Sequence, residues 1–207
     1  MTILSTRKTR KLVHGFTLVE TMVAVTILTL AVSGPLYVAS RALVAAEIAS
    51  DNLTASYLAQ EGIEYVRAMR DDAYLNVYNP TSGTSGSAVS STAWSNFLTF
   101  IIPCKGAYAC TLDASPGVIT GVASGHSLAP CLVGSCPVLY LDAVAYNQKN
   151  SGTPTSYTRT VWTENVPGAP VDTNGNPVDV RIVSKVSWVF HGTPYSVIIA
   201  DHLTPWQ

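Results

Sequence analysis

The feature that most constrains this chain is a run of 20 residues without a charged side chain, from Thr21 to Ser40. A stretch of about 20 apolar residues is long enough to cross a bilayer as a helix. Counted from Phe16 to Ala39, the segment has a helical length of about 36 Å. Its apolar core is longer than that of a signal peptide, and no small-residue cleavage site closes it. We therefore predict a helix that stays attached to the remainder of the chain.

Charged residues are distributed unevenly around this segment. The whole chain has 12 basic and 13 acidic residues, which is a net charge of −1. The first 11 positions contain no acid and four basic residues: Arg7, Lys8, Arg10 and Lys11. The positive-inside tendency then predicts a cytoplasmic N-terminus and an extracytoplasmic remainder. The overall balance gives no electrostatic reason to expect a nucleic-acid partner.

We expect one long helix over residues 16–72, with a transmembrane half, 16–40, and an amphipathic half, 41–72. Gly34-Pro35 predicts a kink or a local melt, because proline removes a backbone donor and clashes with the preceding turn. The amphipathic half shows helical spacing that suits packing on a globular domain or on neighbouring helices, at Leu43, Ala46, Leu53 and Tyr57 and at Leu58, Gly62, Val66 and Met69. The helix is predicted to end near Asp71-Asp72.

Residues 73–207 are predicted to form a β-rich head, so the fold class is α+β, with an antiparallel sheet packed on the long helix. Residues 79–93 are rich in Ser, Thr and Gly, which is typical of an exposed loop or linker. Strands are expected over 138–146 and 157–162. Apolar and polar residues alternate over 178–190, and a turn at 191–194 precedes a returning strand at 195–203. The pattern over 94–137 supports no assignment.

The four cysteines all lie after the apolar segment, at Cys104, Cys110, Cys131 and Cys136. Their spacings, C-x5-C and C-x4-C, differ from the C-x2-C of many zinc sites. In an extracytoplasmic domain an even count favours two disulfides. Free thiols and a metal site are the alternatives. Among the three pairings we favour the local ones, Cys104–Cys110 and Cys131–Cys136, because short loops close easily.

Acidic and amide side chains alternate after residue 171, as at the start of a calcium loop, and the residues are Asp172, Asn174, Asn176 and Asp179. Position six of such a loop is glycine and position twelve is glutamate, whereas this chain has Pro177 and Val183 there. An Asn-Gly turn before a strand is therefore the favoured interpretation. We find no nucleophile elbow, phosphate-binding loop or dinucleotide fingerprint, and we expect neither catalysis nor a cofactor.

The residues that enter the apolar segment are Gly15-Phe16-Thr17-Leu18-Val19-Glu20. With the basic leader before them, they resemble the N-terminus of type IV pilins and pseudopilins. The resemblance implies that a membrane prepilin peptidase cuts after Gly15 and N-methylates the new amine of Phe16. It also implies assembly of subunits through their helices, with Thr17, Glu20 and Pro35 as assembly residues. The implied partners are other pilin subunits, an assembly ATPase and a membrane platform protein.

Elementary chemistry agrees with two of these roles. A carboxylate in a membrane helix is costly, so Glu20 is a functional candidate that the amine of a neighbouring subunit would neutralise. Gly15 removes side-chain bulk at the scissile bond and disfavours helix there. The alternatives are an interfacial glutamate without a partner and an ordinary helix-start glycine.

A second resemblance, to minor pilins, rests on three segments: Leu58–Glu64, Tyr157–Val161 and the closing hairpin around Val186 and Gly192. It implies a structural subunit of a type IV pilus-like filament at the cell surface. Two rivals remain. One is a pseudopilin of a secretion or DNA-uptake machine, and the other is a single-pass anchored domain that never polymerises.

Overall fold

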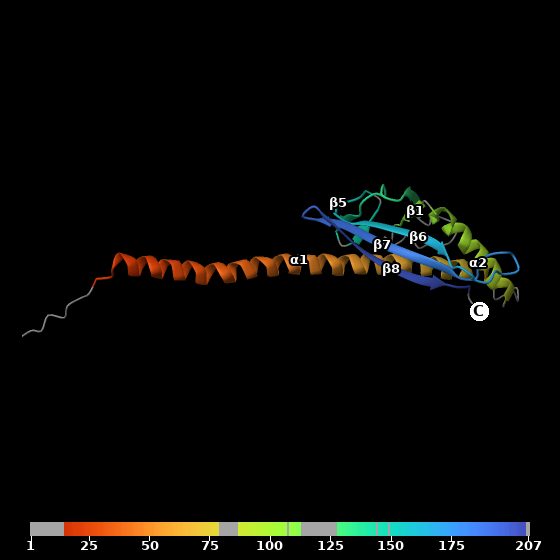
Figure 1. Cartoon of the computed structure of the whole chain (residues 1–207). Helices are drawn as coiled ribbons and strands as arrows, with labels where there is room; N and C mark the ends of the chain where they lie inside the picture. Colours follow the sequence, from red (N-terminus) through yellow and green to blue (C-terminus); the bar gives the residue numbers. More distant parts are fainter. Residues whose placement is uncertain are drawn as a thin grey trace, which may run out of the picture. The chain divides into compact units, whose positions relative to one another are not determined.

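The computed structural model describes residues 15–78, 87–106, 108–112, 128–143, 145–148 and 150–205. Of the leader expected over residues 1–15, only Gly15 lies within the described residues. The chain divides into two compact units, residues 1–47 and residues 48–207. Helix α1, Leu18–Val77, contributes to both units (Figure 1). The long N-terminal helix and an antiparallel sheet together give the expected α+β fold.

The end of α1 differs from the prediction. We expected the helix to stop near Asp71-Asp72, and it continues to Val77. The buried stripe explains the extension, because Ala73 follows Met69 by one helical turn and both side chains are in the core. Packing of Ala73 in the core thus stabilises the helix beyond Asp71 and Asp72.

The local melt expected at Gly34-Pro35 is also wrong, because α1 is assigned as continuous helix through Pro35. A proline removes one backbone donor from the helix. The turns before and after it keep their own hydrogen bonds, so a single loss leaves a 60-residue helix in one piece.

A second helix, α2 (Ser87–Ile101), occupies part of the segment that we predicted as a loop over 79–93. Residues 79–86 lie outside the described part of the chain. Buried apolar side chains recur along α2 at helical spacing, and they are Val89, Ala93, Trp94, Phe97 and Ile101. The abundant Ser and Thr between them concealed this pattern. A short 3₁₀ helix, η1 (Ile102–Cys104), follows directly.

The main sheet is antiparallel and has the strand order β2-β1-β6-β7-β8. Its strands are β1 (Tyr108–Thr111), β2 (Ala129–Leu132), β6 (Thr158–Asn165), β7 (Val180–Phe190) and β8 (Thr193–Leu203). The three expected strands near the C-terminus are confirmed, with shifts of at most three residues at their ends. The turn predicted over 191–194 is shorter: His191 and Gly192 alone connect β7 and β8, both with positive φ, as a two-residue hairpin turn requires.

A small second sheet replaces the single strand expected over 138–146. Its order is β4-β3-β5, with β3 (Tyr140–Asp142), β4 (Ala145–Asn147) and β5 (Thr153–Pro154). Ala143 has a φ of 49°, which breaks the strand between β3 and β4.

The core of the head lies between the second half of α1 and one face of the main sheet (Figure 1). The inward positions of β7 are buried, as the period-2 pattern predicts: Val180, Ile182, Ser184, Val186 and Trp188. Of the two apolar stripes on α1, the one at Leu58, Gly62, Val66 and Met69 is buried against this face, whereas Leu43, Leu53 and Tyr57 stay exposed.

Two long-range polar contacts join the layers. The guanidinium of Arg159 on β6 is fully buried and donates to the carbonyls of Leu58 on α1 and Leu112 after β1, each at 3.2 Å. It also forms an ion pair with Glu61. The amide of Gln148 accepts a hydrogen bond from the Leu112 N–H and donates to the Arg159 carbonyl.

Candidate functional site: the N-terminal segment

The helix begins shortly after Gly15 and Phe16, which the sequence analysis predicts as the processing site. Gly15, Phe16 and Thr17 are exposed and precede the first helical residue, Leu18. The hydroxyl oxygen of Thr17 accepts a hydrogen bond from the Glu20 N–H at 3.2 Å, which is the geometry of an N-cap. This cap fixes the start of α1, so the Gly15–Phe16 peptide bond stays outside the helix and open to solvent.

The surface of α1 that follows is apolar on every side. All residues from Leu18 to Glu47 are exposed, and Leu18, Ile27 and Leu30 each expose 60% or more of their surface. An 18-residue window of this helix has a mean hydropathy of 1.9, and none of the window is buried. The helix is therefore long and apolar enough to cross a membrane. The segment is therefore consistent with a membrane anchor.

Hydroxyl side chains in this apolar part are satisfied by the helix itself. Each one donates to the carbonyl oxygen three residues earlier, at 2.8–3.1 Å, and the residues are Thr21, Thr26, Thr29, Ser33 and Ser40. Such internal hydrogen bonds allow a hydroxyl to face hydrocarbon without a missing partner. Glu20 is then the one charged side chain between Gly15 and Ser40.

Glu20 lies in the first turn of α1, one turn after the cap. A negative charge is favourable there, because the free N–H groups of the turn carry partial positive charge. The next basic side chain along the described part of α1 is Arg41, so α1 itself offers this carboxylate no nearby cation.

The other end of the apolar segment has a polar contact that the sequence analysis did not identify. The Arg41 Nε donates to the Tyr37 hydroxyl at 3.3 Å, and the guanidinium lies 5.4 Å from the centre of the tyrosine ring. Tyrosine and arginine are typical of the membrane–water interface. The four-residue spacing of the two side chains was the available signal.

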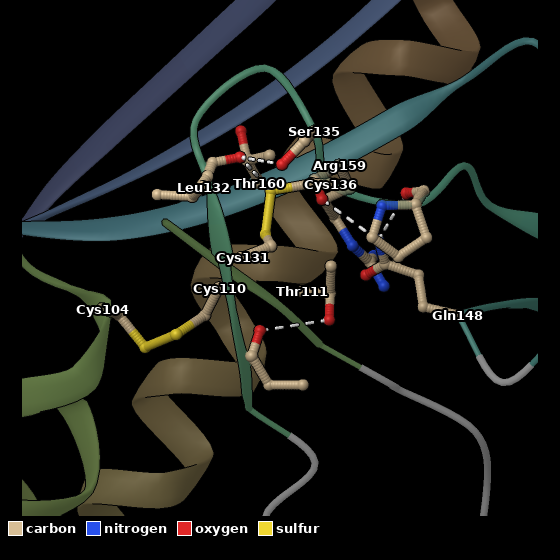
Figure 2. Close-up of a disulfide and its surroundings, with 12 residues drawn as sticks. Cys104, Cys110, Thr111, Cys131, Leu132, Ser135, Cys136, Gln148, Arg159 and Thr160 are labelled. Atoms are coloured by element: carbon tan, nitrogen blue, oxygen red, sulfur yellow. Dashed lines mark hydrogen bonds between the residues drawn. A yellow bond between two sulfur atoms is a disulfide. The ribbon is translucent and has the colours of Figure 1, made fainter. Parts of the chain in front are cut away.

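The cysteines form the two expected disulfides, and the local pairing is the one found. Cys104–Cys110 joins η1 to β1, and Cys131–Cys136 closes the turn after β2 (Figure 2). Each pair has a Cα–Cα separation of 5.2 Å, within the usual range. Disulfides persist in oxidising compartments, in agreement with a head outside the cytoplasm.

The segment proposed as a calcium loop is used as a turn. The Asp172 carboxylate accepts hydrogen bonds from the backbone N–H groups of Asn174 and Asn176, both at 2.8 Å. Although burial acts to raise it, the pKa of Asp172 is lowered, because the hydrogen bonds from Asn176, Asn174 and Gly175 stabilise the charged form. Asp179 instead contacts His202, with its nearer oxygen 3.0 Å from Nδ1. The Asn176 side-chain amide donates to Asp172 at 3.3 Å and to the Ser95 hydroxyl at 2.8 Å, so Asp172 and Asn176 stabilise the turn itself, whereas Asp179 has a different partner.

Within the described ranges, no group of three or more His, Cys, Asp or Glu side chains converges on one point.

Comparison with known proteins identifies the N-terminal segment and no other part. Residues 10–34 match the family described as "Prokaryotic N-terminal methylation motif". The match includes Gly15, Phe16, Thr17 and Glu20 and ends one residue before Pro35. No curated protein and no solved structure matched the chain.

Proposed function

We propose that this chain, which carries the N-terminal methylation motif of type IV pilins and pseudopilins, is a minor pilin-like structural subunit of a type IV pilus-like filament. The observation that carries the proposal is the isolation of Glu20, a lone charge on a segment whose other polar side chains are satisfied internally. The pilin family is generally structural, so we assign the chain no catalytic role.

The first step is processing at the Gly15–Phe16 bond. A protease binds its substrate in an extended conformation, and the Thr17 cap keeps this bond ahead of the helix. Gly15 adds no side chain that would obstruct binding. Prepilin peptidase then exposes the amine of Phe16 and methylates it, which leaves a cation two residues before Leu18, the first residue of α1.

The second step is assembly. Glu20 becomes the fifth residue of the mature chain, and a carboxylate in a membrane helix costs about 2.5–3.5 kcal/mol at the helix centre and less toward its ends. The amine of a neighbouring subunit offsets this cost, because opposite charges attract strongly where the dielectric is low. Only one axial offset between subunits brings the two charges together, so the pair selects the stagger of the filament.

Topology and partners follow from the same segment. The basic leader stays in the cytoplasm, residues 16–40 cross the membrane, and the disulfide-bonded head lies outside. Tyr37 and Arg41 then mark the outer interface. Extraction from the membrane requires the assembly ATPase and platform protein, and Pro35 eases bending of the helix during this step.

The native N-terminus tests the proposal. Mass spectrometry of the protein from its own cells should find a chain that starts at N-methylated Phe16. A Gly15→Val variant should remain uncut, because a branched side chain occupies the space beside the scissile bond. An intact Met1 in the native protein, or a cut after residue 40, would overturn the assignment.

Assembly is tested separately with Glu20→Ala. Cleavage should persist, whereas the amount of the subunit in sheared surface filaments should fall at least tenfold. Glu47→Ala is the matched control, because it removes an exposed acid from the same helix outside the apolar segment. Equal filament content in the two variants would show that charge pairing at Glu20 is unimportant.

A further inference from the structure

A cavity of the head lies on the face of the main sheet that α1 does not cover. Its volume is about 500 Å³, within the range of small-molecule sites. The floor is formed by β6, β7 and β8, and one wall is the turn closed by the Cys131–Cys136 disulfide, which contributes Val133 and Gly134. In Figure 2 this disulfide lies beside Thr160 of β6.

Four polar side chains make up the floor as a two-by-two grid. Thr160 pairs with Lys185 across β6 and β7, and Thr158 pairs with Ser187 two positions further along. Directly opposite residues place their Cβ atoms about 5 Å apart, and alternate residues along a strand are about 6.6 Å apart. The grid therefore has the dimensions of one hexose ring. Hydroxyl groups can both donate and accept hydrogen bonds, and the Thr160 hydroxyl, which donates to the Lys185 carbonyl at 3.4 Å, can still accept one.

An aromatic and an aliphatic side chain flank the grid. Trp162 follows Thr160 on the same face of β6, and its indole N–H donates to Glu164 at 2.9 Å. That hydrogen bond holds the ring along the strand instead of leaving it free to rotate. Ile198 lines the cavity from β8, opposite Lys185. Apolar surface beside a set of hydroxyl groups suits a ring that has both C–H and O–H groups.

Lys185 adds a positive charge to this floor. No carboxylate lies within ion-pair distance of it in the described part of the chain, whereas Arg181, on the same face of β7, pairs with Glu164 at 2.8 Å. A bound carboxylate would therefore supply the counter-ion that the lysine has not found within the described structure.

We infer that this cavity binds an acidic saccharide, with the carboxylate on Lys185, the hydroxyl groups over the grid and one sugar face against Trp162. An extended peptide fits less well, because β6 and β7 are interior strands whose backbone groups are already paired on both sides. The site lies within the head and does not depend on the proposed assembly mechanism.

The full-length protein in detergent, applied to an array of neutral saccharides and their uronic- or sialic-acid counterparts, tests this inference. Acidic glycans should bind and their neutral counterparts should not. Calorimetric titration with the best acidic glycan should then show a loss of at least about tenfold in affinity for Lys185→Gln. Lys185→Arg should keep most of the affinity, because it keeps the charge.

Further variants and a folding check show whether the binding is specific to this cavity. Lys105→Gln removes an exposed lysine that does not line the cavity and should leave the affinity unchanged. Trp162→Ala should weaken binding of the acidic glycan, and Trp162→Phe should weaken it less. Thermal melting confirms that each variant is folded. The inference is overturned if no acidic glycan binds, if neutral glycans bind equally well, or if Lys185→Gln and Lys105→Gln have the same affinity.

Discussion

The two halves of α1 have the same backbone conformation and opposite surroundings. No residue between Leu18 and Glu47 is buried, whereas nine residues between Ala55 and Ala73 are. The second half has one apolar stripe, which a single sheet face can cover. The first half is apolar on all sides, and no single face can cover such a helix. Its stable surroundings are lipid or several other helices, so its role is defined by what lies outside the chain.

Because of this contrast, mutations in the head and mutations in the first half of α1 should have different consequences. Variants in the head should change its stability and leave processing intact, and variants in the first half should do the reverse. Tryptophan fluorescence reports on the head alone, because all four tryptophans lie after residue 47. Urea unfolding followed by fluorescence and mass spectrometry of the N-terminus therefore measure the two halves independently.

The largest expected effect is that of Arg159→Ala. The side chain is fully buried and its hydrogen bonds reach α1 and the segment after β1, so its loss leaves carbonyls of Leu58 and Leu112 without this donor. We expect the free energy of unfolding to fall by about 3–5 kcal/mol. The N-terminus should still begin at Phe16.

Two further variants separate what hydrogen bonding, ion pairing and side-chain volume contribute to the stability effect of Arg159. Arg159→Met restores most of the volume and should remain strongly destabilising, because the hydrogen bonds are still missing. Glu61→Gln should cost much less, because its side chain is 42% exposed and water screens the ion pair. A loss below about 1 kcal/mol for Arg159→Ala would contradict this account.

A smaller effect is expected at Gly62, where α1 approaches β7 closely. A Cβ on Gly62 would lie 2.5 Å from the Ser184 hydroxyl oxygen and 3.3 Å from its Cβ. We expect Gly62→Ala to destabilise the head by about 1–2 kcal/mol, since overpacking exceeds the gain in helix propensity. The measurement is the urea midpoint of the purified protein.

Ser184→Ala provides the matched test of that contact. The buried hydroxyl of Ser184 has no hydrogen-bond partner among the described residues, so its removal should cost little. In the Ser184→Ala background most of the Gly62→Ala penalty should disappear. Strictly additive effects would show that the close approach is not the cause.

Tyr157 should make a still smaller, pH-dependent contribution. Its hydroxyl donates to Asp51 at 2.8 Å, so Tyr157→Phe should cost about 1 kcal/mol at neutral pH. Burial, followed by the hydrogen bond with Asp51, raises the pKa of Tyr157 above its usual value of about 10. The folded state therefore holds this proton more tightly, and stability is lost as the pH rises above about 10. Urea midpoints between pH 8 and pH 11 should fall more steeply for the wild type than for Tyr157→Phe, and parallel curves would contradict the assignment.

The features that could be predicted from the sequence are those determined by residues close to one another along the chain. The N-terminal motif could be predicted because it occupies a few consecutive positions, and residues 10–34 match the methylation family. Strand β7 could be predicted because its alternation spans 11 residues. The disulfide pairs were found because each closes a short loop.

The missed features have two different causes. Arg159 bonds to residues about 100 positions away, and no local pattern signals such a contact. The groove around Lys185 likewise requires three strands and a disulfide turn to be in place. In contrast, α2 and the Thr17 cap had local signals. For α2, the signal was the helical spacing of apolar residues within a Ser- and Thr-rich stretch. For the cap, the signal was a threonine, Thr17, three residues before a glutamate, Glu20.

The smallest effect on the head should come from Thr17→Ala, which tests the separation of the two halves most directly. Loss of an N-cap destabilises a helix by about 0.5–2 kcal/mol. The first turn of α1 should therefore fray, and the Glu20 amide should exchange its hydrogen faster. Thr17→Ser keeps a hydroxyl acceptor and should retain slow exchange. The urea midpoint of the head should be unchanged in both variants, because Thr17 precedes residue 48, where the second unit begins. A shifted midpoint in Thr17→Ala would mean that the two halves of α1 are energetically coupled and that their contrast is one of exposure alone.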